Sequence, residues 1–415
     1  MPTDRTKPFY GWYITLTLAL TETISWGILY YVFSVFLTPM EQELGWSRAE
    51  LTGGFSLMLL VAGGMAFPAG AWIDRHGARL LMTAGSAAAC LLVIAWSAVS
   101  TLPAFYAIWI GLGVCAAAVL YDPAFTVVAH WFVRRRSTAL VVITFAAGLA
   151  STIFLPLSDA LLVAFGWRVA VLILGLFLGA VTIPLHLLIL RRRPEDLGLL
   201  PDGETQSIRS KSRAAGDVTF RKALTGRTFW LLTLGFGLFY LAAAALRVHF
   251  IPFLIGSGFD SSTAAYATGA IGIMQVGGRV VFAPLERRFS TRTMILLIFA
   301  LQAAAQAVLL AGHAPLLIAA FILLFGAAQG AGTLVRPAIL AALYGAANFG
   351  RIASVMTIFL TLASTAAPLF ASLLYDRAGS YQPVVVLVVA ISAAATGVAA
   401  LAHRSILGAV PETSS

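Results

Sequence analysis

Five charged residues lie inside stretches that are otherwise apolar enough to cross a bilayer, and they are the best candidates for chemistry in this chain. Two are acids, Glu22 and Asp122, and three are bases, Arg247, Arg279 and Arg336. A guanidinium stays protonated at any working pH, and placing one at the bilayer centre costs at least ~2.5 to 3.5 kcal/mol. By default, such residues mark a substrate or ion pathway.

The balance of these charges predicts an anionic ligand. Two acids facing three arginines leave roughly one positive charge unbalanced, which a bound monoanion would neutralise unless an acid is protonated. Arg279 is the expected anchor, because a guanidinium can hold a carboxylate through two parallel hydrogen bonds. The alternative is a structural pair of Arg279 with Glu22 or Asp122. Asp122 and Arg336 are each followed by proline, and they could pair with each other instead.

One further residue, His249, and the two acids could take part in binding or in proton movement. His249, close to Arg247 in the sequence, could donate to a substrate or relay a proton, or it could simply be packed. Glu22 is the stronger proton carrier and Asp122 the second, because burial disfavours the charged form of a carboxyl group. Glu22 could instead be the fixed partner of Arg247.

Aromatic hydroxyls complete the predicted site. Tyr30 and Tyr121 lie at depths that suit a cavity and could donate hydrogen bonds to a substrate, although ordinary packing is the alternative. The sequence has no phosphate-binding loop with a Walker lysine, no metal-ligand cluster and no nucleophile elbow. We therefore expect neither an enzyme nor a cofactor nor a metal.

The elements that position these residues are long apolar helices. The chain has 415 residues, of which 60% are hydrophobic and 11% charged, a balance that indicates an all-α membrane protein with many spans. Windows of ~20 apolar residues, the length that crosses a ~30 Å hydrocarbon core, predict twelve transmembrane helices. In chain order they cover 12–38, 49–73, 79–99, 103–131, 137–161, 168–190, 228–255, 262–283, 291–312, 314–342, 351–374 and 382–402. The first segment is followed by Glu41-Gln42-Glu43 rather than by a cleavage site for a signal peptide, so it should remain as helix 1.

The basic residues predict the orientation in the bilayer. The formal charge is +10, but the basic residues gather on alternate loops, which explains them better than binding of nucleic acid. Only Arg48, Arg168 and Arg377 fall on the opposite side. By the positive-inside rule both termini are cytoplasmic, in a plasma membrane or bacterial inner membrane.

The chain also repeats itself. A polar stretch, 191–227, separates two predicted six-helix bundles, 1–190 and 228–415. At a shift of 213 or 214 residues, four local patterns of the first bundle recur in the second. The matches are Gly63-Gly64 with Gly277-Gly278, Arg79 with Arg292, Asp122-Pro123 with Arg336-Pro337, and 149–152 with 362–365. Two pseudo-symmetric bundles of this kind are the architecture of the major facilitator transporters.

The loop between the second and third predicted helices makes that resemblance specific. Its sequence GAWIDRHGAR resembles the facilitator loop signature G-x-x-x-D-R-x-G-x-R through Gly70, Asp74, Arg75, Gly77 and Arg79. Gly77 permits a sharp turn, while the charged residues can hold the cytoplasmic face. The resemblance implies a gating loop that latches the two halves in one transport state.

Motifs along nearly the whole chain resemble those of the monocarboxylate and oxalate/formate branch of this superfamily. They are Tyr10-Gly11-Trp12, Leu44-Gly45-Trp46-Ser47-Arg48, Trp131-Phe132, Gly166-Trp167-Arg168, 193–199, 248–253 and Gly278-Arg279. In that branch the helix 8 arginine pairs with the substrate carboxylate, a role that would pass to Arg279. The resemblance also implies that helices 1, 4, 7 and 10 line a central cavity.

Two positions depart from the animal members of that branch. Gln275 stands where they have an aspartate, four residues before the helix 8 arginine, and Tyr30 aligns with their helix 1 lysine. Gln275 could still hydrogen-bond a carboxylate. We therefore expect a monomeric secondary transporter in a lipid bilayer that moves a small organic anion, by proton-coupled monocarboxylate symport. Proton-coupled efflux of a drug or other amphiphile, exchange of organic anions, and a sensor that binds without transport are the alternatives.

Overall fold

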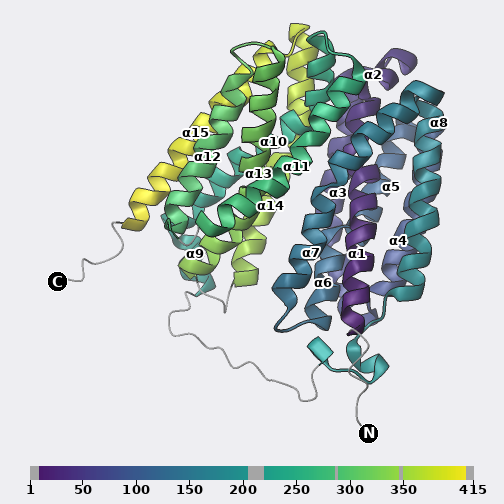
Figure 1. The fold of residues 1–415 in the computed structure, drawn as a ribbon, viewed down its shortest axis with the longest axis vertical. Coiled ribbons are helices and arrows are strands. Elements are labelled where there is room, and N and C mark those ends of the chain that lie inside the picture. The colour runs from purple at the N-terminus through teal and green to yellow at the C-terminus, as the bar shows by residue number, and fades with distance from the viewer. Residues whose placement is uncertain (1–8, 204–218, 286–287, 345–348, 408–415) are drawn as a thin grey trace. The chain divides into compact units, whose positions relative to one another are not determined.

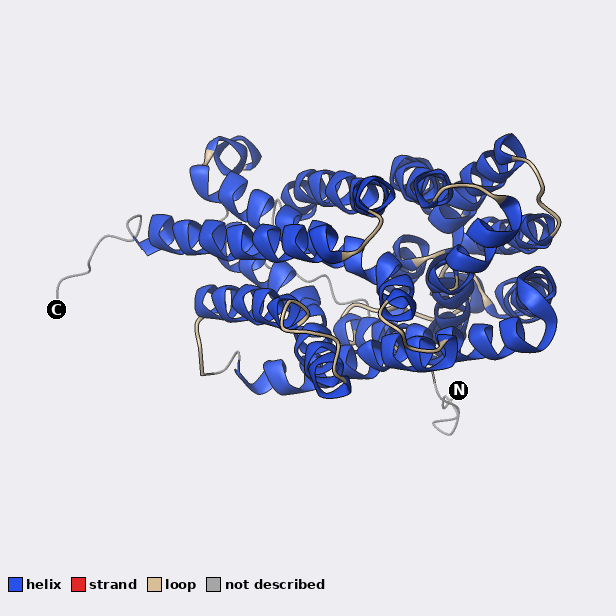
Figure 2. Ribbon diagram, turned by 90° about the horizontal axis from the view of Figure 1, so that it is seen from above, coloured by secondary structure: helices blue, strands red, loops and turns tan. Residues whose placement is uncertain are grey.

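The computed structural model of the protein describes residues 9–203, 219–285, 288–344 and 349–407 (Figure 1). All regular structure in these ranges is helical (Figure 2). The centre of the predicted linker, 204–218, lies outside the described residues, and so does the side chain of Asp74.

The chain divides into two compact units. Unit 1 is Met1–Trp46 with Leu57–Ser210, and unit 2 is Ser47–Ser56 with Lys211–Ser415. The short segment Ser47–Ser56 therefore groups with the second unit, although it opens a helix whose remainder belongs to the first. The predicted bundle boundaries at 190 and 228 remain a prediction.

Unit 1 is built from helices that proline and glycine interrupt. The first crossing is α1 (Tyr10–Trp26), a π-helical stretch (Gly27–Tyr31) and α2 (Phe33–Leu44), ended by Gly45 in the left-handed region at φ 70°. It is longer than the predicted 12–38. The others are α3 (Arg48–His76), α4 (Ala78–Ser97), α5 (Leu102–Val119), α6 (Tyr121–Trp131), α7 (Arg136–Gly148) and α8 (Ala150–Ile189).

Two of the interruptions have clear local causes. Leu120, between α5 and α6, is extended, and Pro123 three residues later has no N–H and clashes with the carbonyl one turn before it. Gly166, inside α8, has φ 77° and ψ 163°, a conformation that residues with a Cβ rarely adopt. It separates the two crossings predicted as 137–161 and 168–190.

The core of unit 1 gathers around the first turns of α1. Ile14 and Leu18 of α1 pack with Val128 and Trp131 of α6, and Met82 of α4 joins them. Because these apolar side chains come from helices far apart in the sequence, the cluster fixes α1 and α6 against each other. Both helices carry predicted site residues.

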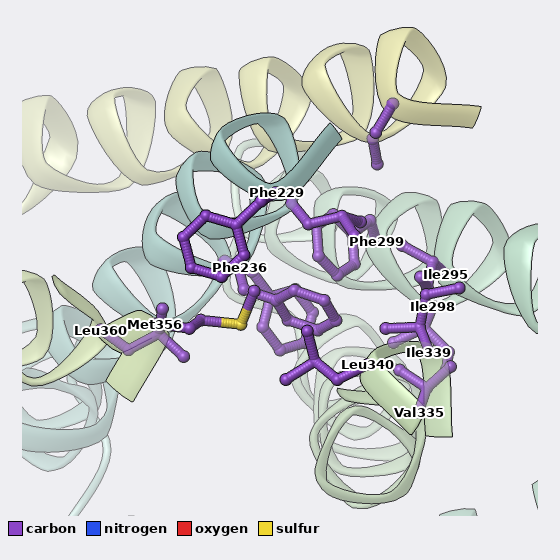
Figure 3. Close-up of a cluster of buried hydrophobic side chains, with 14 of the residues drawn as sticks. Phe229, Phe236, Ile295, Ile298, Phe299, Val335, Ile339, Leu340, Met356 and Leu360 are labelled. Carbon is purple, nitrogen blue, oxygen red and sulfur yellow. The ribbon is translucent and has the colours of Figure 1, made fainter. Parts of the chain in front are cut away.

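Unit 2 follows the same plan with longer uninterrupted helices. They are α9 (Phe220–Thr225), α10 (Arg227–Gly256), α11 (Ser261–Leu285), α12 (Thr291–Val308), α13 (Pro315–Tyr344), α14 (Phe349–Ala378) and α15 (Gln382–Leu407). Figure 3 shows their shared core, in which Phe236 of α10 and Phe299 of α12 lie against Val335 of α13 and Met356 of α14. Unlike α5 and α6 around Pro123, α13 runs on through Pro337.

The helix lengths fit an integral membrane protein. Nine helical segments of the described residues are long and apolar enough to cross a bilayer. One of them, Thr138–Ile189, has 52 residues and would be roughly 78 Å long as one straight helix, enough for two crossings divided at Gly166. With α11 and the shorter apolar helix Thr293–Val308, this is consistent with the twelve predicted helices.

Candidate functional site

Among the described residues of unit 1, Glu22 carries the most deeply buried carboxyl group. Glu22 lies on α1 with no exposed surface, and neither carboxyl oxygen has a hydrogen-bond partner among the described residues. A buried polar group without a partner costs free energy, and an ionised one costs much more. The prediction that Glu22 is buried is therefore confirmed, and its isolation makes it suited to holding a proton.

Aromatic rings pack together one turn after Glu22, at the π-helical stretch. Trp26, one turn after Glu22, packs against Tyr30 at 5.3 Å and against Tyr121 at 5.0 Å between ring centroids. Tyr30 also packs on Tyr31. The two predicted tyrosines are thus joined through Trp26, since the π-helical turn brings Tyr30 towards the start of α6.

Asp122 differs from the sequence interpretation. It is exposed at the second position of α6, beside the break at Leu120, rather than buried within a continuous helix. Pro123 causes the break, and its effect on the neighbouring side chain could not be deduced from hydropathy. Asp122 is near enough to Glu22 for its charge to act on that carboxyl group.

In unit 2 a chain of buried polar side chains holds Arg247. An NH2 group of Arg247 on α10 donates to Gln329 Oε1 of α13 at 3.1 Å, and Gln329 in turn donates to Gln302 of α12. Gln302 donates to Ser392 of α15 at 3.3 Å, and Ser392 donates to Gln306 at 2.6 Å. The four polar partners are all buried, so their hydrogen bonds fix the amide of Gln329 with its oxygen towards the guanidinium.

Close packing of α11 on α13 places Arg279 and Gln275. A Cβ on Gly278 would lie 2.7 Å from Ala327 Cα, and a Cβ on Gly330 would collide with the carbonyl of Gln275. Only glycine permits this approach of the two backbones. Arg279 is partly buried directly after Gly278, and Gln275 is partly buried one turn before it.

The two arginine-bearing helices therefore meet the same part of α13. Gln329, which holds Arg247, lies between Ala327 and Gly330, on which α11 packs. Arg336 is two turns further along α13 and partly buried, with its guanidinium 5.9 Å from the ring centroid of Tyr240. Any pairing of the unit 2 arginines with Glu22 or Asp122 of unit 1 remains a prediction.

His249 lies in a network that the sequence did not predict. Its Nδ1 is 3.0 Å from the Tyr381 hydroxyl, and its Nε2 is 3.0 Å from the Pro368 carbonyl and 3.2 Å from Ser372 Oγ. Arg48, only 8% exposed, donates to the same Tyr381 hydroxyl at 2.7 Å. Both ring nitrogens of His249 have protein partners, so the geometry favours a positioning role over the predicted contact with substrate.

The segment Ser47–Ser56 adds to this network. Thr52 donates to Ser372 at 2.8 Å, and the backbone N–H of Ala49 donates to Asp376 at 3.1 Å. The guanidinium of Arg48 also lies 4.1 Å from the ring centroid of Tyr375. Because four side chains of α14 and of the turn after it take part, Arg48 is a structural residue here rather than a generic basic loop residue.

The predicted gating loop has the expected turn. Gly77 has φ 83°, and a Cβ there would lie 2.7 Å from the side chain of Arg192. Arg79 donates to the carbonyl of Leu187 at 2.6 Å, whereas Arg75 is exposed. Gly70 lies within α3 with open space where a Cβ would stand. The latching role of this loop remains a prediction.

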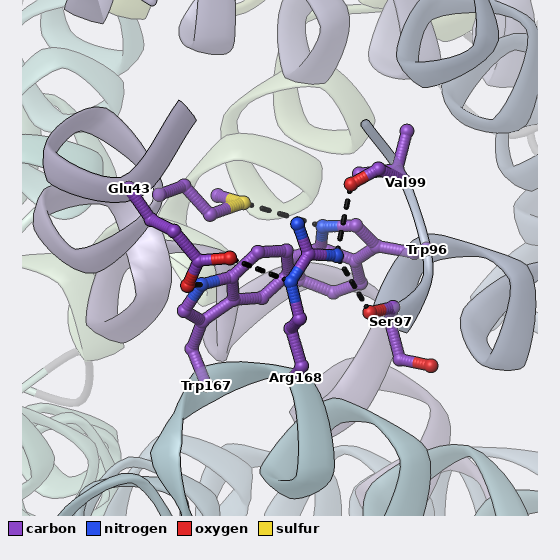
Figure 4. Close-up of polar contacts among 7 residues, drawn as sticks. Glu43, Trp96, Ser97, Val99, Trp167 and Arg168 are labelled. Atoms are coloured by element: carbon purple, nitrogen blue, oxygen red, sulfur yellow. Dashed lines mark hydrogen bonds and ion pairs between the residues drawn. The ribbon is translucent and has the colours of Figure 1, made fainter. Parts of the chain in front are cut away.

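The Gly166-Trp167-Arg168 motif closes one end of unit 1 (Figure 4). Arg168 Nε donates to Glu43 at 2.6 Å, and its NH1 donates to the carbonyls of Ser97 and Val99 at 2.9 Å each. Trp167 donates to the second oxygen of the same carboxylate. The four hydrogen bonds tie the end of α2 and the end of α4 to the kink in α8, so this motif is structural.

Asp202, on the segment that follows α8, connects that segment to the turn between α6 and α7 by hydrogen bonds. Its carboxylate accepts the backbone N–H groups of Val133, Arg134 and Arg135 at 2.9, 2.7 and 3.1 Å. Burial alone would raise the pKa of Asp202, but these three donors and the charge of Arg135 hold the pKa below its ordinary value. The negative charge also suits the start of α7 at Arg136.

One buried acid escaped the sequence interpretation. Asp159 on α8 is only 2% exposed. It lies two residues from the predicted helix end at 161, where a charge is unremarkable, and only the continuation of α8 makes its burial evident.

Comparison with known proteins identifies the family that has this architecture. The sequence profile of the Major Facilitator Superfamily matches residues 18–315. The chain belongs to this superfamily. Its family and its structural neighbours are transporters rather than enzymes, as the sequence predicted. The fold class is confirmed as the all-α major facilitator fold.

Several individual members of the superfamily are similar to the chain. It is 25% identical to the transporter pytF of Aspergillus terreus over 67% of its own length and 89% of that protein. It is 27% identical to monocarboxylate transporter 11 of Homo sapiens over 66% of its own length, and it spans 55% of the human protein. A crystal structure of a bacterial homologue of the human lysosomal transporter Spinster superposes with a TM-score of 0.78 over 99% of this chain and 100% of that one, at 16% identity.

Proposed function

We propose that this major facilitator transporter moves a small organic anion, a monocarboxylate, together with a proton by alternating access. The observation that carries the proposal is the one-sided charge of unit 2. Helices α10, α11 and α13 contain Arg247, Arg279 and Arg336 within or near their membrane-spanning parts and no acidic residue at all. A set of cations in a low-dielectric environment favours an anionic ligand.

Arg279 is the proposed carboxylate anchor, with Gln275 and Arg247 beside it. The packing of α11 on α13 supports this assignment, because it sets Arg279 on the helix that meets the stretch 327–330. Gln329 on that stretch holds Arg247. A guanidinium offers two parallel N–H donors to a carboxylate, and the amide of Gln275 can add a third. Arg336, with Tyr240 at its side, would attract the anion along α13.

Glu22 is the proposed proton carrier. It is buried without a hydrogen-bond partner among the described residues, one turn before the packed rings of Trp26 and Tyr121. A carboxyl group in such a place changes its charge only when water or a ligand reaches it, which couples protonation to conformation. Exposed Asp122, near Glu22, would pass the proton to solvent, while Tyr30 and Tyr121 form the wall of the site.

The remaining assignments rest on the sequence. We propose that the protein is monomeric in a plasma membrane or bacterial inner membrane, with both termini in the cytoplasm. The loop from Gly70 to Arg79 would then face the cytoplasm and act as the gate. We propose uptake by symport, with Glu22 of unit 1 as the proton site and Arg279 of unit 2 as the anion site.

Transport by purified protein tests the proposal. The carboxylate is first chosen by a thermal-shift screen of short carboxylates, since a ligand that binds the native state raises its melting temperature. Uptake of that radiolabelled carboxylate into proteoliposomes is then compared for wild type, Arg279→Ala and Arg279→Lys. The alanine variant should lose transport, and lysine should restore at most a small part, because it cannot make the paired contact. Full uptake by Arg279→Ala would exclude Arg279 as the anchor.

A further inference from the structure

A groove on the surface of unit 2, between α10, α14 and α15, has no role in the proposed transport path. Its volume is 450 Å³. Leu241, Ala245, Ala371 and Val388 are among its lining residues, and Arg377 is the single charged one among those described. The apolar walls suit a hydrocarbon chain, whereas the guanidinium of Arg377 suits an anionic group.

The walls of the groove face the surroundings of the protein. Phe370 of α14 is 63% exposed and Leu387 of α15 is 44% exposed, both over the groove. In a membrane-spanning helix such side chains lie against lipid chains. The occupant of the groove must therefore be apolar along most of its length.

The length of the groove along α14 matches the thickness of the hydrocarbon layer of one bilayer leaflet. Ala367 and Arg377 both line it, and they are ten residues apart on α14, which corresponds to roughly 15 Å of helix. That is half of the ~30 Å hydrocarbon core. The apolar part of the groove thus has the reach of one acyl chain, and Arg377 stands near the end of α14, where a lipid head group would lie.

Arg377 also differs from the other two basic residues predicted on its side of the membrane. Arg168 is paired with Glu43, and Arg48 is bound to Tyr381. No ion pair or hydrogen bond joins Arg377 to another residue in the described part of the chain. Its guanidinium is exposed beside the groove and is available to an external anion.

We propose that this groove binds an anionic phospholipid, with one acyl chain along α14 and α15 and the phosphate group at Arg377. The charge of Arg377 selects the anionic head group, while the apolar wall at Leu387 holds the chain. Bound there, the lipid would fill the contact between α10, α14 and α15 and stabilise unit 2. The site does not depend on the identity of the transported substrate.

Native mass spectrometry of the purified protein tests this inference. Phosphatidylglycerol and phosphatidylcholine with identical acyl chains are titrated into wild type, Arg377→Gln and Arg377→Lys. One arginine near a membrane surface contributes enough to change the affinity for an anionic lipid about five-fold. Arg377→Gln should therefore bind phosphatidylglycerol about five-fold more weakly, with a smaller loss for phosphatidylcholine because its choline cation offsets the phosphate charge, and Arg377→Lys should retain most of the preference.

The apolar wall has its own variant and control. Leu387→Trp fills the groove and should weaken both lipids, whereas Leu401→Trp, at an exposed position of α15 outside the groove, should weaken neither. Equal phosphatidylglycerol binding by wild type and Arg377→Gln would overturn the proposal. So would equal lipid binding by Leu387→Trp and wild type, or a co-purifying polypeptide in place of bound lipid.

Discussion

The contact of α11 with α13 can be tested by two neighbouring glycines. Gly277 and Gly278 both lie inside α11, so replacing either by alanine raises the helix propensity by the same ~1 kcal/mol. The two positions differ in the space that is available for an added Cβ atom. Around a Cβ at Gly277 there is open space, whereas a Cβ at Gly278 would lie 2.7 Å from Ala327 Cα and 2.9 Å from Ala327 C.

The backbone of Ala327 cannot turn away as a side chain could, so Gly278→Ala must separate the two helices by several tenths of an ångström or more. Such overpacking costs about 1 to 3 kcal/mol. The difference between the two variants should be of that size, because the propensity gain cancels. For a unit of about 200 residues this corresponds to a melting temperature lower by roughly 2 to 12 °C for Gly278→Ala than for Gly277→Ala.

Thermal unfolding of the two purified variants, followed by tryptophan fluorescence, measures this difference. Arg279 follows Gly278 directly, so Gly278→Ala should also raise KM for the carboxylate, since a displacement of about 1 Å can cost up to 10²-fold. Gly277→Ala should keep KM near that of the wild type and raise the melting temperature by roughly 2 to 4 °C. Equal melting temperatures and equal KM for the two variants would show that the described packing of α11 on α13 is incorrect.

Three further predictions concern other contacts. Glu22→Gln should abolish the dependence of uptake on a pH gradient while counterflow of the carboxylate persists, and loss of both together would count against Glu22 as proton carrier. Gln329→Leu removes the acceptor that holds Arg247. Because a hydrogen bond to a charged group contributes about 1.5 to 3 kcal/mol, KM for the carboxylate should rise by roughly tenfold or more. An unchanged KM would contradict the assignment of Arg247 to the anion site. Asp202→Asn should lower the melting temperature at pH 7 by an amount equivalent to about 1 kcal/mol, because hydrogen bonds to a neutral amide are weaker than those to a carboxylate and the charge at the start of α7 is lost. Folding lowers the pKa of Asp202, so this stabilisation is present above the unfolded pKa of about 3.9 and is lost as the pH falls through the folded pKa. The melting temperatures of the wild type and the variant should therefore become equal only below about pH 4.

The sequence predicted the helical fold well because hydropathy and the cost of buried charge are local properties. The burial of Glu22 and the sharp turn at Gly77 both follow from the residue type and its neighbours in the chain. The break before Pro123 has a local cause as well, because proline disrupts the helical turn before it. Its consequence, an exposed Asp122, depends on which way the chain turns afterwards, and hydropathy does not contain that information.

Contacts between distant residues could not be predicted in this way. His249 and Arg48 lie far apart in the sequence and meet at the hydroxyl of Tyr381, and no spacing pattern connects the three residues. The buried amide chain from Gln329 to Gln302 also consists of uncharged residues, which hydropathy alone does not distinguish from ordinary packing. A search for glutamines inside apolar segments would have singled out both.

The most direct test of the central claim is whether the carboxylate and a proton move together. Wild-type protein is reconstituted into liposomes that contain a pH indicator, and the selected carboxylate is added outside. The carboxylate should cross lipid slowly by itself, so pyruvate is used if the protein binds it. The account predicts acidification of the interior that is absent from empty liposomes and from Arg279→Ala proteoliposomes. Carboxylate uptake by the wild type without any such acidification would contradict proton symport.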